Sequence, residues 1–433
     1  MGVWETSLIG FASLLGLMMA GMPLAFAMIL VGAAGIVAVV GWTPALGMLG
    51  QVPVSDTMRY ELSVVPMFVL MGMLVDRAGM SRDLYHACHG FLGHRRGGLA
   101  MATIVACAGF AAVSGSSLAT AATMGRVSMP SMRRYGYSDE LASGSIAAGG
   151  TLGILIPPSV ILVLYGIMTG TDIGLLFIAG VLPGFVAVLF YIGTIMVVTR
   201  LRPEAGPRTE RVAMRERFAR LTSVGPILLL FILIIGGIYL GVFTPTEAAG
   251  VGAFGAFLFC LWRRVLTPAI FLECVVATAR MTAILFILLV GALLFSNFVN
   301  LAGLPSALQQ LVAGYGLSPL GVIIFLMAIY IVLGCFLESL SMVLLTVPIF
   351  FPLVMSLGYD PIWFGIIVVM VTELSLITPP VGLNLFILKS TIGNISLGKI
   401  YRGIMPFVAA DILRLALMIA FPAIILILPQ LAR

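Results

Sequence analysis

The sequence predicts an all-α polytopic membrane protein that contains an inverted repeat, two re-entrant hairpins and two broken helices. Three observations carry this prediction: the composition, long uncharged runs, and a repeated pattern of helix-breaking residues. The 433-residue chain is 61% hydrophobic and only 9% charged, with a mean hydropathy of +1.18. Soluble globular proteins carry about a quarter charged residues, so this composition cannot supply a water-facing surface.

The uncharged runs predict membrane-spanning helices. Leu8–Val40 and Ile173–Thr199 contain no charged residue, and a spanning helix needs roughly 20 apolar residues. The segments 119–131 and 340–353 are too short to cross a bilayer alone, which is typical of the arms of re-entrant hairpins. The predicted helical segments are 5–20, 23–41, 61–76, 98–114, 119–131, 139–170, 174–199, 221–242, 246–262, 281–300, 319–335, 340–353, 362–388 and 403–428.

Basic residues lie between the apolar runs and indicate which connections face the cytoplasm. The net charge is +6, and Lys389 and Lys399 are the only lysines. The segment Arg200–Arg220 carries seven arginines, so the positive-inside rule predicts a cytoplasmic loop there. This placement accounts for the positive charge without a nucleic-acid partner.

An internal repeat is the most informative feature of the sequence. When the sequence is shifted by 222 residues, Pro130–Pro158 aligns with Pro352–Pro380 without a gap. The matched residues are mostly turn formers and helix breakers, which determine architecture. The identical pairs are Pro130 and Pro352, Gly136-Tyr137 and Gly358-Tyr359, Leu152 and Leu374, and Pro157-Pro158 and Pro379-Pro380.

The charges of the connections predict that the two copies are inverted. The connections 77–96 and 133–134 contain arginines, whereas their counterparts 300–318 and 354–361 contain no Lys or Arg. The positive-inside rule therefore places the two sets on opposite sides of the membrane. Inverted repeats that contain interrupted helices are the architecture of secondary transporters.

The repeat divides the chain into five predicted segments. Each copy is expected to contain a scaffold arm, a hairpin and a broken helix, and the remaining segments supply scaffold helices. The predicted segments are N-terminal scaffold helices at 1–60, the first repeat at 61–170, connecting scaffold helices with the cytoplasmic loop 200–220 at 171–281, the second repeat at 282–392, and a C-terminal helix at 393–433.

Each copy places polar residues at a hairpin tip and at a helix break. The tips are Ser114–Ser117 and Cys335–Ser341, and the breaks are Gly149–Pro158 and Thr372–Pro380. Proline removes a backbone donor and frees carbonyl oxygens, which are tolerated at membrane depth only when they are buried or line a cavity. Freed carbonyls and hydroxyls can coordinate a small cation, and half-helix N-termini favour an anionic substrate. Close helix packing is the structural alternative for such small residues.

Three other classes of protein share parts of this pattern. An ATP-driven pump needs a nucleotide site, but Lys389-Ser390 follows apolar residues rather than a Gly-rich phosphate loop. An ATP-driven importer whose ATPase is a separate chain stays open as an alternative. A hydrolase that uses Ser116 or Ser117 would need a nearby base, and all three histidines lie within 86–94. A passive channel shares the composition and stays open as an alternative.

Two further polar groups are interpreted as structural. Asp411 and Arg414 are three residues apart in the last predicted span, so they are expected to form an intrahelical ion pair. The segment 86–94 holds three histidines and Cys88, but no acidic or cysteine pair completes four metal ligands. A solvated interfacial helix is therefore favoured there over a metal site.

The chain resembles the DctM-like large permease subunits of the tripartite ATP-independent periplasmic (TRAP) transporters over essentially its full length. The Ser-Gly-Ser-Ser, Gly-Tyr and Pro-Pro motifs occur in this order, which makes the match specific. The segments that carry the resemblance are Ser114–Ser117, Thr120–Met132, Arg133–Tyr137, Gly149–Ser159 and Glu373–Asn384.

The resemblance implies a sodium-coupled, elevator-type secondary transporter in the bacterial inner membrane and no enzymatic activity. It implies a small organic acid as substrate, a soluble periplasmic binding protein that delivers it, and a small membrane subunit. That subunit is expected to be a separate chain, since one short span or pair precedes the first repeat. No cofactor is expected besides Na⁺ as the coupling ion.

The resemblance also implies sodium sites where the hairpin tips face the broken helices, with the substrate beside them. The predicted sodium-binding residues are Ser114, Gly115, Ser116, Ser117, Gly150, Thr151, Glu338, Ser339, Ser341, Thr372 and Pro379. The predicted substrate-binding residues are Ser116, Thr120, Pro157, Glu373, Pro380 and Asn384.

Overall fold

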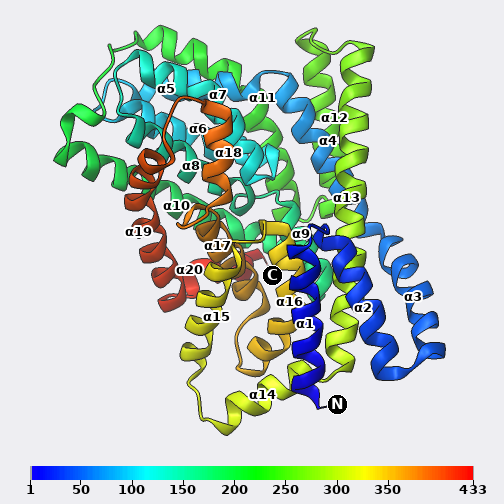
Figure 1. Ribbon diagram of the computed structural model, residues 1–433. Helices are drawn as coiled ribbons and strands as arrows, with labels where there is room; N and C mark the ends of the chain where they lie inside the picture. Colours follow the sequence, from blue (N-terminus) through cyan, green and yellow to red (C-terminus); the bar gives the residue numbers. More distant parts are fainter. Residues whose placement is uncertain (1, 433) are drawn as a thin grey trace.

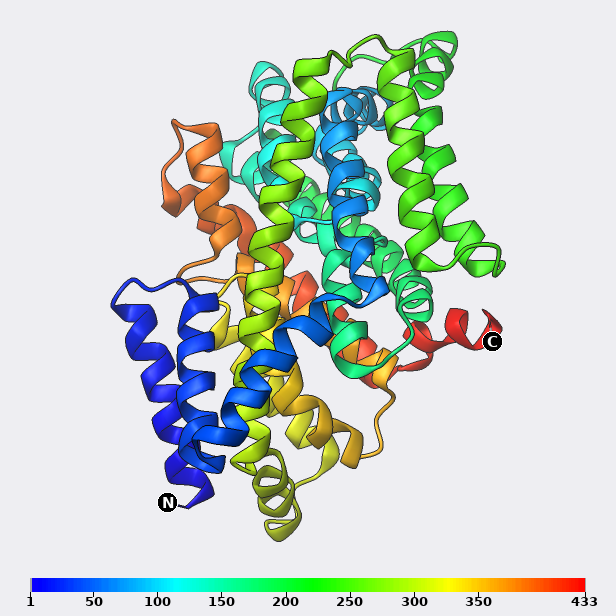
Figure 2. The ribbon, with the colours of Figure 1, turned by 90° about the vertical axis from the view of Figure 1, so that its right-hand side faces the viewer.

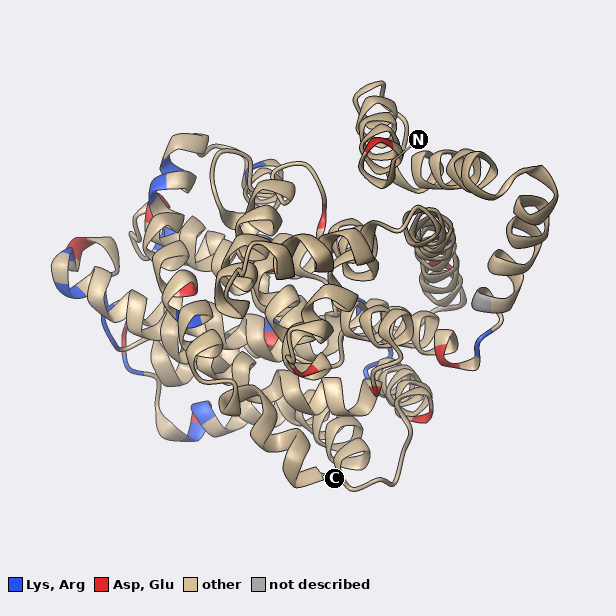
Figure 3. Cartoon of the chain, turned by 90° about the horizontal axis from the view of Figure 1, so that it is seen from below, with Lys and Arg blue, Asp and Glu red and all other residues tan. Residues whose placement is uncertain are grey.

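The computed structural model describes residues 2–432, and these residues form an assembly of α-helices (Figure 1). Seven of the described helices are long and apolar enough to cross a membrane, and shorter apolar helices accompany them. Charged residues are sparse along most of the ribbon (Figure 3). The prediction of an all-α polytopic membrane protein is confirmed. Residues 1 and 433, the outer ends of the first and last predicted segments, lie outside the described part.

The helices form two groups, seen from two directions in Figure 1 and Figure 2. In the first group α2 packs along α13, and α4 packs along α12. In the second group α8 packs against α6, α7 and α19. The first group comprises α1 (Val3–Met19), α2 (Leu24–Val40), α3 (Trp42–Thr57), α4 (Val64–Arg77), α11 (Met214–Tyr239), α12 (Pro245–Trp262) and α13 (Pro268–Leu301).

The second group contains both hairpins and both broken helices. The short helices α5 (Met80–Leu92) and α14 (Leu304–Gly314) join it to the first group, because α5 contacts α6 and α11 while α14 contacts α16 and α13. The second group comprises α6 (Gly98–Ser114), α7 (Ser117–Arg134), α8 (Asp139–Leu155), α9 (Val160–Thr169), α10 (Ile173–Leu201), α15 (Pro319–Leu333), α16 (Ser339–Ser356), α17 (Pro361–Ile377), α18 (Leu383–Ile392), α19 (Leu397–Ala420) and α20 (Ala423–Ala432).

The repeat is visible as two copies of one helix order. Helices α4 to α9 and α13 to α18 each give a leading helix, a short connecting helix, a hairpin and a helix interrupted at Pro-Pro. The short helices α5 and α14 lie at opposite ends of the molecule (Figure 1). The two hairpins, the two broken helices and their inverted arrangement are thus confirmed, whereas the division into five segments stays a prediction.

Local chemistry explains where the interrupted elements break. At the first hairpin tip, Gly115 has φ of +59°, a left-handed conformation that favours glycine. Ser116 then caps α7, since its side chain accepts a hydrogen bond from the backbone N–H of Ala119. The breaks at Pro157-Pro158 and Pro379-Pro380 follow from the missing proline donors, and both Pro-Pro peptide bonds are cis.

Several predicted boundaries were wrong. The predicted loop 200–220 is shorter, because α10 continues to Leu201 and α11 begins at Met214, so four of its seven arginines are helical. The predicted span 403–428 is two helices, α19 and α20, separated near Pro422. Helices α3 and α14 were not predicted as helical segments, α5 extends N-terminally beyond the interfacial helix expected at 86–94, and α13 begins well before residue 281. Polar residues within these helices interrupt the apolar runs on which the prediction depended.

Helices α8 and α19 are held in backbone contact by paired glycines. A Cβ atom at Gly144 would overlap the carbonyl oxygen of Gly403, and one at Gly403 would overlap that of Glu140. Small residues allow such close approach between membrane helices, where packing replaces the hydrophobic driving force. The contact fixes α19, and with it Asp411 and Arg414, against the first broken helix.

Gly403→Ala is expected to destabilise the protein by about 1–3 kcal/mol, the usual cost of overpacking a tight interface. The added methyl group meets backbone atoms, which cannot rotate away. The measurement is the midpoint of thermal unfolding of the purified chain. Gly398→Ala on the same helix is the control, because no atom outside its own helical turn lies within 4 Å of its added Cβ; equal midpoints for the two variants would contradict the prediction.

Candidate functional site

The first hairpin tip is a cluster of hydroxyls and carbonyls. The hydroxyl oxygens of Ser114 and Thr120 lie 2.7 Å apart, and the Thr120 hydroxyl donates to the carbonyl of Ser116 at 2.8 Å. Ser117 and Thr120 are buried, whereas Ser114 and Ser116 are partly exposed. Oxygen atoms of three predicted residues, Ser114, Ser116 and Thr120, therefore form one compact group.

This tip packs directly on the first broken helix. A Cβ atom at Gly153 would lie 2.5 Å from the Ser116 carbonyl oxygen, and one at Gly150 would lie 3.3 Å from that of Ser117. A Cβ at Gly115 would lie 3.6 Å from the carbonyl oxygen of Pro158. The glycines thus let the hairpin backbone approach α8 and the Pro-Pro break, as the sequence predicted for these elements.

Thr151 does not present its hydroxyl to this tip. Its side-chain oxygen lies 2.8 Å from the Tyr191 hydroxyl and donates to the Ala148 carbonyl at 2.7 Å. Tyr191 in turn donates to Asp411, with its oxygen 2.7 and 2.9 Å from the two carboxylate oxygens. Only the backbone of Thr151 remains for the predicted role in sodium binding.

Asp411 and Arg414 form the predicted intrahelical pair. The Arg414 Nη2 atom lies 2.8 Å from Asp411 Oδ1, and the two side chains are only 2% and 1% exposed. The Arg414 guanidinium also lies over the Tyr191 ring, 5.7 Å from its centroid. Tyr191 was not predicted at this site, because it comes from α10, far from α19 along the chain.

The second hairpin tip meets the second broken helix in the corresponding way. The Ser339 hydroxyl donates to Glu373 Oε1 at 3.1 Å, and both residues are buried. Glu338 occupies the N-cap position of α16, and its carboxyl group interacts with the Ser341 hydroxyl. A Cβ at Gly334 would overlap the Ser375 side chain, so this tip also lies in direct contact with its broken helix.

Some polar groups around the second break have hydrogen-bond partners and others have none. The Tyr401 hydroxyl on α19 donates to the Pro380 carbonyl oxygen at 2.6 Å and lies 3.0 Å from the Val381 carbonyl oxygen. The Pro380 carbonyl at the break therefore already has a hydrogen-bond donor, from a residue that was not predicted to lie there. Thr372 and Asn384 are fully buried, and their side-chain polar atoms have no partner among the described residues. Unpartnered buried polar groups are costly, which marks this region as one that favours a ligand.

One cavity joins the two hairpin tips. It has a volume of about 160 Å³ and is lined by residues of both tips, with Asp76 of α4 and apolar side chains completing its wall. Asp76 was not predicted, since its position before Arg77 in the sequence resembles an ordinary helix end. Of the predicted residues, those that line this cavity are Ser114, Gly115, Ser116, Ser117, Glu338 and Ser339. Ile154 and Val160 on either side of the first Pro-Pro also line it, whereas the Pro-Pro residues themselves and Asn384 do not.

Residues 11–424 match the family described as the tripartite ATP-independent periplasmic transporter, DctM component. The chain belongs to this family. It is 38% identical over 377 residues to the C4-dicarboxylate TRAP transporter large permease protein DctM of Pseudomonas aeruginosa, covering 86% of this chain and 87% of the relative. It is 33% identical to the sialic acid large permease protein SiaM of Vibrio cholerae, covering 96% and 97%.

Two further relationships bear on architecture. The isethionate TRAP transporter permease protein DctMQ of Oleidesulfovibrio alaskensis is 31% identical over 93% of this chain, which spans 63% of that relative. The crystal structure of the Alcanivorax borkumensis YdaH transporter has the same fold, with a TM-score of 0.60 at 15% identity over 88% of this chain and 90% of that one. The relatives are permeases, so the chain is not an enzyme, and the hydrolase alternative is excluded.

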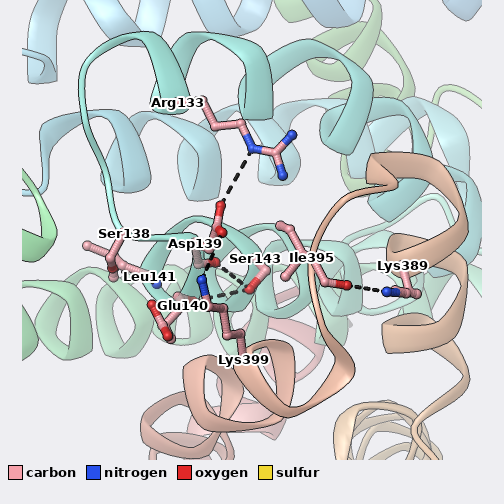
Figure 4. Close-up of polar contacts among 9 residues, drawn as sticks. All are labelled: Arg133, Ser138, Asp139, Glu140, Leu141, Ser143, Lys389, Ile395 and Lys399. Atoms are coloured by element: carbon pink, nitrogen blue, oxygen red, sulfur yellow. Dashed lines mark hydrogen bonds and ion pairs between the residues drawn. The ribbon is translucent and has the colours of Figure 1, made fainter.

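Ion pairs connect the ends of α7, α8 and α19 near the two lysines of the permease (Figure 4). Asp139 at the start of α8 lies 3.5 Å from Arg133 of α7 and 3.4 Å from Lys399 of α19. Lys389 of α18 donates to the carbonyl of Ile395 in the connection to α19. Partly exposed pairs of this kind contribute about 0–1 kcal/mol each, so they orient the helix ends rather than stabilise the site.

Proposed function

We propose that the chain is the large membrane subunit of a sodium-coupled secondary transporter that imports a small organic acid. The observation that carries the proposal is the pair of hairpin tips, which come from inverted copies, face their own broken helices and open into one cavity. This is the arrangement by which inverted-repeat transporters hold a substrate near the middle of the membrane. An elevator motion moves the second helix group against the first.

Sodium coupling is supported by the type of atom gathered at the tips. Hydroxyl and carbonyl oxygens of Ser114, Ser116 and Thr120 lie together at the first tip, and the second tip adds Glu338 and Ser341. Oxygen atoms from hydroxyls and unwound backbone are the usual ligands of Na⁺ in such transporters. The proposed sites therefore combine each tip with the broken helix behind it.

An organic anion is the substrate class that fits best. The N-termini of α7 and α16 begin at the cavity, and the partial positive charge of a helix N-terminus favours an anion. The relatives named for C4-dicarboxylates and sialic acid carry organic acids in their names. The proposed substrate contacts are Ser116, Thr120, Pro157, Glu373, Pro380 and Asn384, of which Asn384 is buried with unpartnered amide atoms.

Two partners and a location complete the proposal. A soluble periplasmic binding protein delivers the solute, and a small membrane subunit assembles with this chain in the bacterial inner membrane. The DctMQ relative is longer than this chain, which spans 63% of it. The small subunit is proposed as a separate chain.

The test is uptake of a labelled organic acid into vesicles that contain this chain and its two proposed partners. Uptake is expected to require sodium and the binding protein and to ignore ATP. Ser116→Ala and Glu338→Ala are each expected to reduce it by roughly tenfold or more, because each removes an oxygen ligand in a water-poor site. A requirement for ATP would instead indicate an ATP-driven importer, and equilibration without a gradient would indicate a channel.

A further inference from the structure

The predicted cytoplasmic loop that precedes α11 is fixed against the turn between α5 and α6 (Figure 1). The backbone N–H of Gly97 donates to the Gly206 carbonyl at 2.9 Å, and that of Thr209 donates to the Gly93 carbonyl at 3.1 Å. These two bonds hold the loop and the turn together, although the segments are far apart along the chain. The basic residues that lie between the bonded positions are His94, Arg95, Arg96 and Arg208.

Arg217, in the first turn of α11, is buried without a counter-charge. It is 9% exposed, and its Nε atom donates to the Val212 carbonyl at 2.9 Å. No carboxylate among residues 2–432 forms an ion pair with it, since the adjacent Glu216 pairs instead with Arg220. A guanidinium stays protonated in proteins, and a buried charge is costly unless an opposite charge compensates it. Arg217 therefore favours an anion from outside the chain.

The positive charges of four arginines act on one side chain, His94. Desolvation and these charges lower the pKa of the His94 imidazole, and its Nδ1 atom is buried without a partner in the described part of the chain. Glu210, the carboxylate within the same loop, forms no ion pair with any of the four among residues 2–432. This region thus gathers positive charge that no ion pair neutralises. In decreasing order of effect, the four are Arg211, Arg217, Arg95 and Arg208.

The positive-inside rule accounts for arginines in this loop but not for their arrangement. The rule predicts basic residues on the cytoplasmic side, where water can solvate them. Arg96 and Arg215 fit that explanation, because both are exposed and neither acts on His94. The rule does not require a buried guanidinium without a counter-charge, nor backbone bonds that bring basic residues of two segments together. A shared anionic ligand explains both features.

We propose that Arg217, Arg95 and Arg208 bind a phosphate-bearing anion at the predicted cytoplasmic end of the protein, with Arg211 and His94 beside it. Guanidinium groups bind phosphate oxygens through paired N–H donors, and basic pockets between membrane helices on this side bind lipid headgroups. Free phosphate presents the same oxygen atoms. Arg217 belongs to the first helix group and Arg95 lies just before α6 of the second, so the bound anion bridges the two groups. The site is separate from the cavity at the hairpin tips.

The experiment measures the thermal unfolding midpoint of the purified full chain in an uncharged, phosphate-free detergent with two probes. Inorganic phosphate is titrated against chloride at constant ionic strength, and phosphatidylglycerol is titrated against a phosphate-free galactolipid. We expect at least one probe to raise the midpoint saturably, because a ligand that binds only the folded state stabilises it. Arg217→Gln and Arg95→Gln are each expected to raise the half-saturating concentration by roughly tenfold. Arg215→Gln is the control, because this exposed arginine of α11 does not act on His94.

The two probes distinguish the source of the phosphate group. Stabilisation by inorganic phosphate shows that the phosphate group alone suffices, whereas stabilisation by phosphatidylglycerol only identifies a lipid headgroup. No stabilisation by either probe overturns the site, as does an unchanged half-saturating concentration in Arg95→Gln. An equal effect of Arg215→Gln would show a general dependence on charge and would also overturn it.

Two features of the design keep the result decisive. Arg95 is exposed, so Arg95→Gln tests the site even if Arg217→Gln does not fold. The measurement involves no transport, so a negative result refutes the anion site and leaves the proposed function standing.

Discussion

Asp411→Ala is expected to destabilise the permease by about 3–5 kcal/mol, because it leaves the Arg414 guanidinium buried without its counter-charge. Arg414 is 2% exposed and its Nη2 atom pairs with Asp411. Its Nε and Nη1 atoms have no partner among the described residues, so no other acceptor compensates the loss. The measurement is the free energy of unfolding of the chain in a denaturing-detergent titration.

The double variant Asp411→Leu/Arg414→Met is the matched control. It removes both charges and keeps apolar volume, and replacement of a whole buried pair by apolar residues is often neutral or stabilising. We therefore expect the double variant to be more stable than Asp411→Ala. If the two are equally unstable, the loss comes from the Tyr191 contact or from packing, and the electrostatic explanation is wrong.

Gly153→Ala is expected to reduce solute uptake by at least roughly tenfold, because it displaces the first hairpin tip. A misplacement of functional groups by about 1 Å can lower a rate by two orders of magnitude. The added methyl group would lie 2.5 Å from the carbonyl oxygen of Ser116 and 2.7 Å from its carbon. These are backbone atoms, so the first hairpin tip has to move away from α8. The measurement is the initial rate of uptake of a labelled organic acid under an imposed sodium gradient, at matched protein density.

Gly193→Ala on α10 is the control for this substitution, because no atom outside its own helical turn lies within 4 Å of its added Cβ. Both variants make the same chemical change in the same helix group, so helix propensity does not separate them. Wild-type uptake in Gly153→Ala would show that the tip tolerates displacement. The Ser116 carbonyl would then have no part in binding.

The interrupted elements could be predicted from the sequence because their determinants are local. Pro157-Pro158 and Pro379-Pro380 break a helix wherever they occur in an apolar run, and Gly115 marks a turn between two such runs. The inverted orientation was predicted because arginines in the connections report the side of the membrane. These signals need no knowledge of which helices touch.

The contacts between distant segments could not be predicted. Tyr191 and Tyr401 bond to Asp411 and to the Pro380 carbonyl across helix interfaces, and no spacing in the sequence relates them. Thr151 was assigned to the first tip from its place beside Gly150, but its hydroxyl faces α10. Helix α5 was predicted only in part, as an interfacial helix at 86–94, because its polar face interrupts the apolar pattern, which is the usual form of an amphipathic helix.

The difference between Thr151 and Glu373 affects the relative populations of the inward-facing and outward-facing forms of the permease. Two identical inverted copies would give inward-facing and outward-facing forms of equal energy, each populated equally without a gradient. A carboxylate in one copy only removes that equivalence, and an energy difference of about 1.4 kcal/mol is enough for a tenfold preference. The unliganded protein is therefore expected to populate one of the two forms more than the other. Binding to the less populated form has to overcome that energy difference before transport begins.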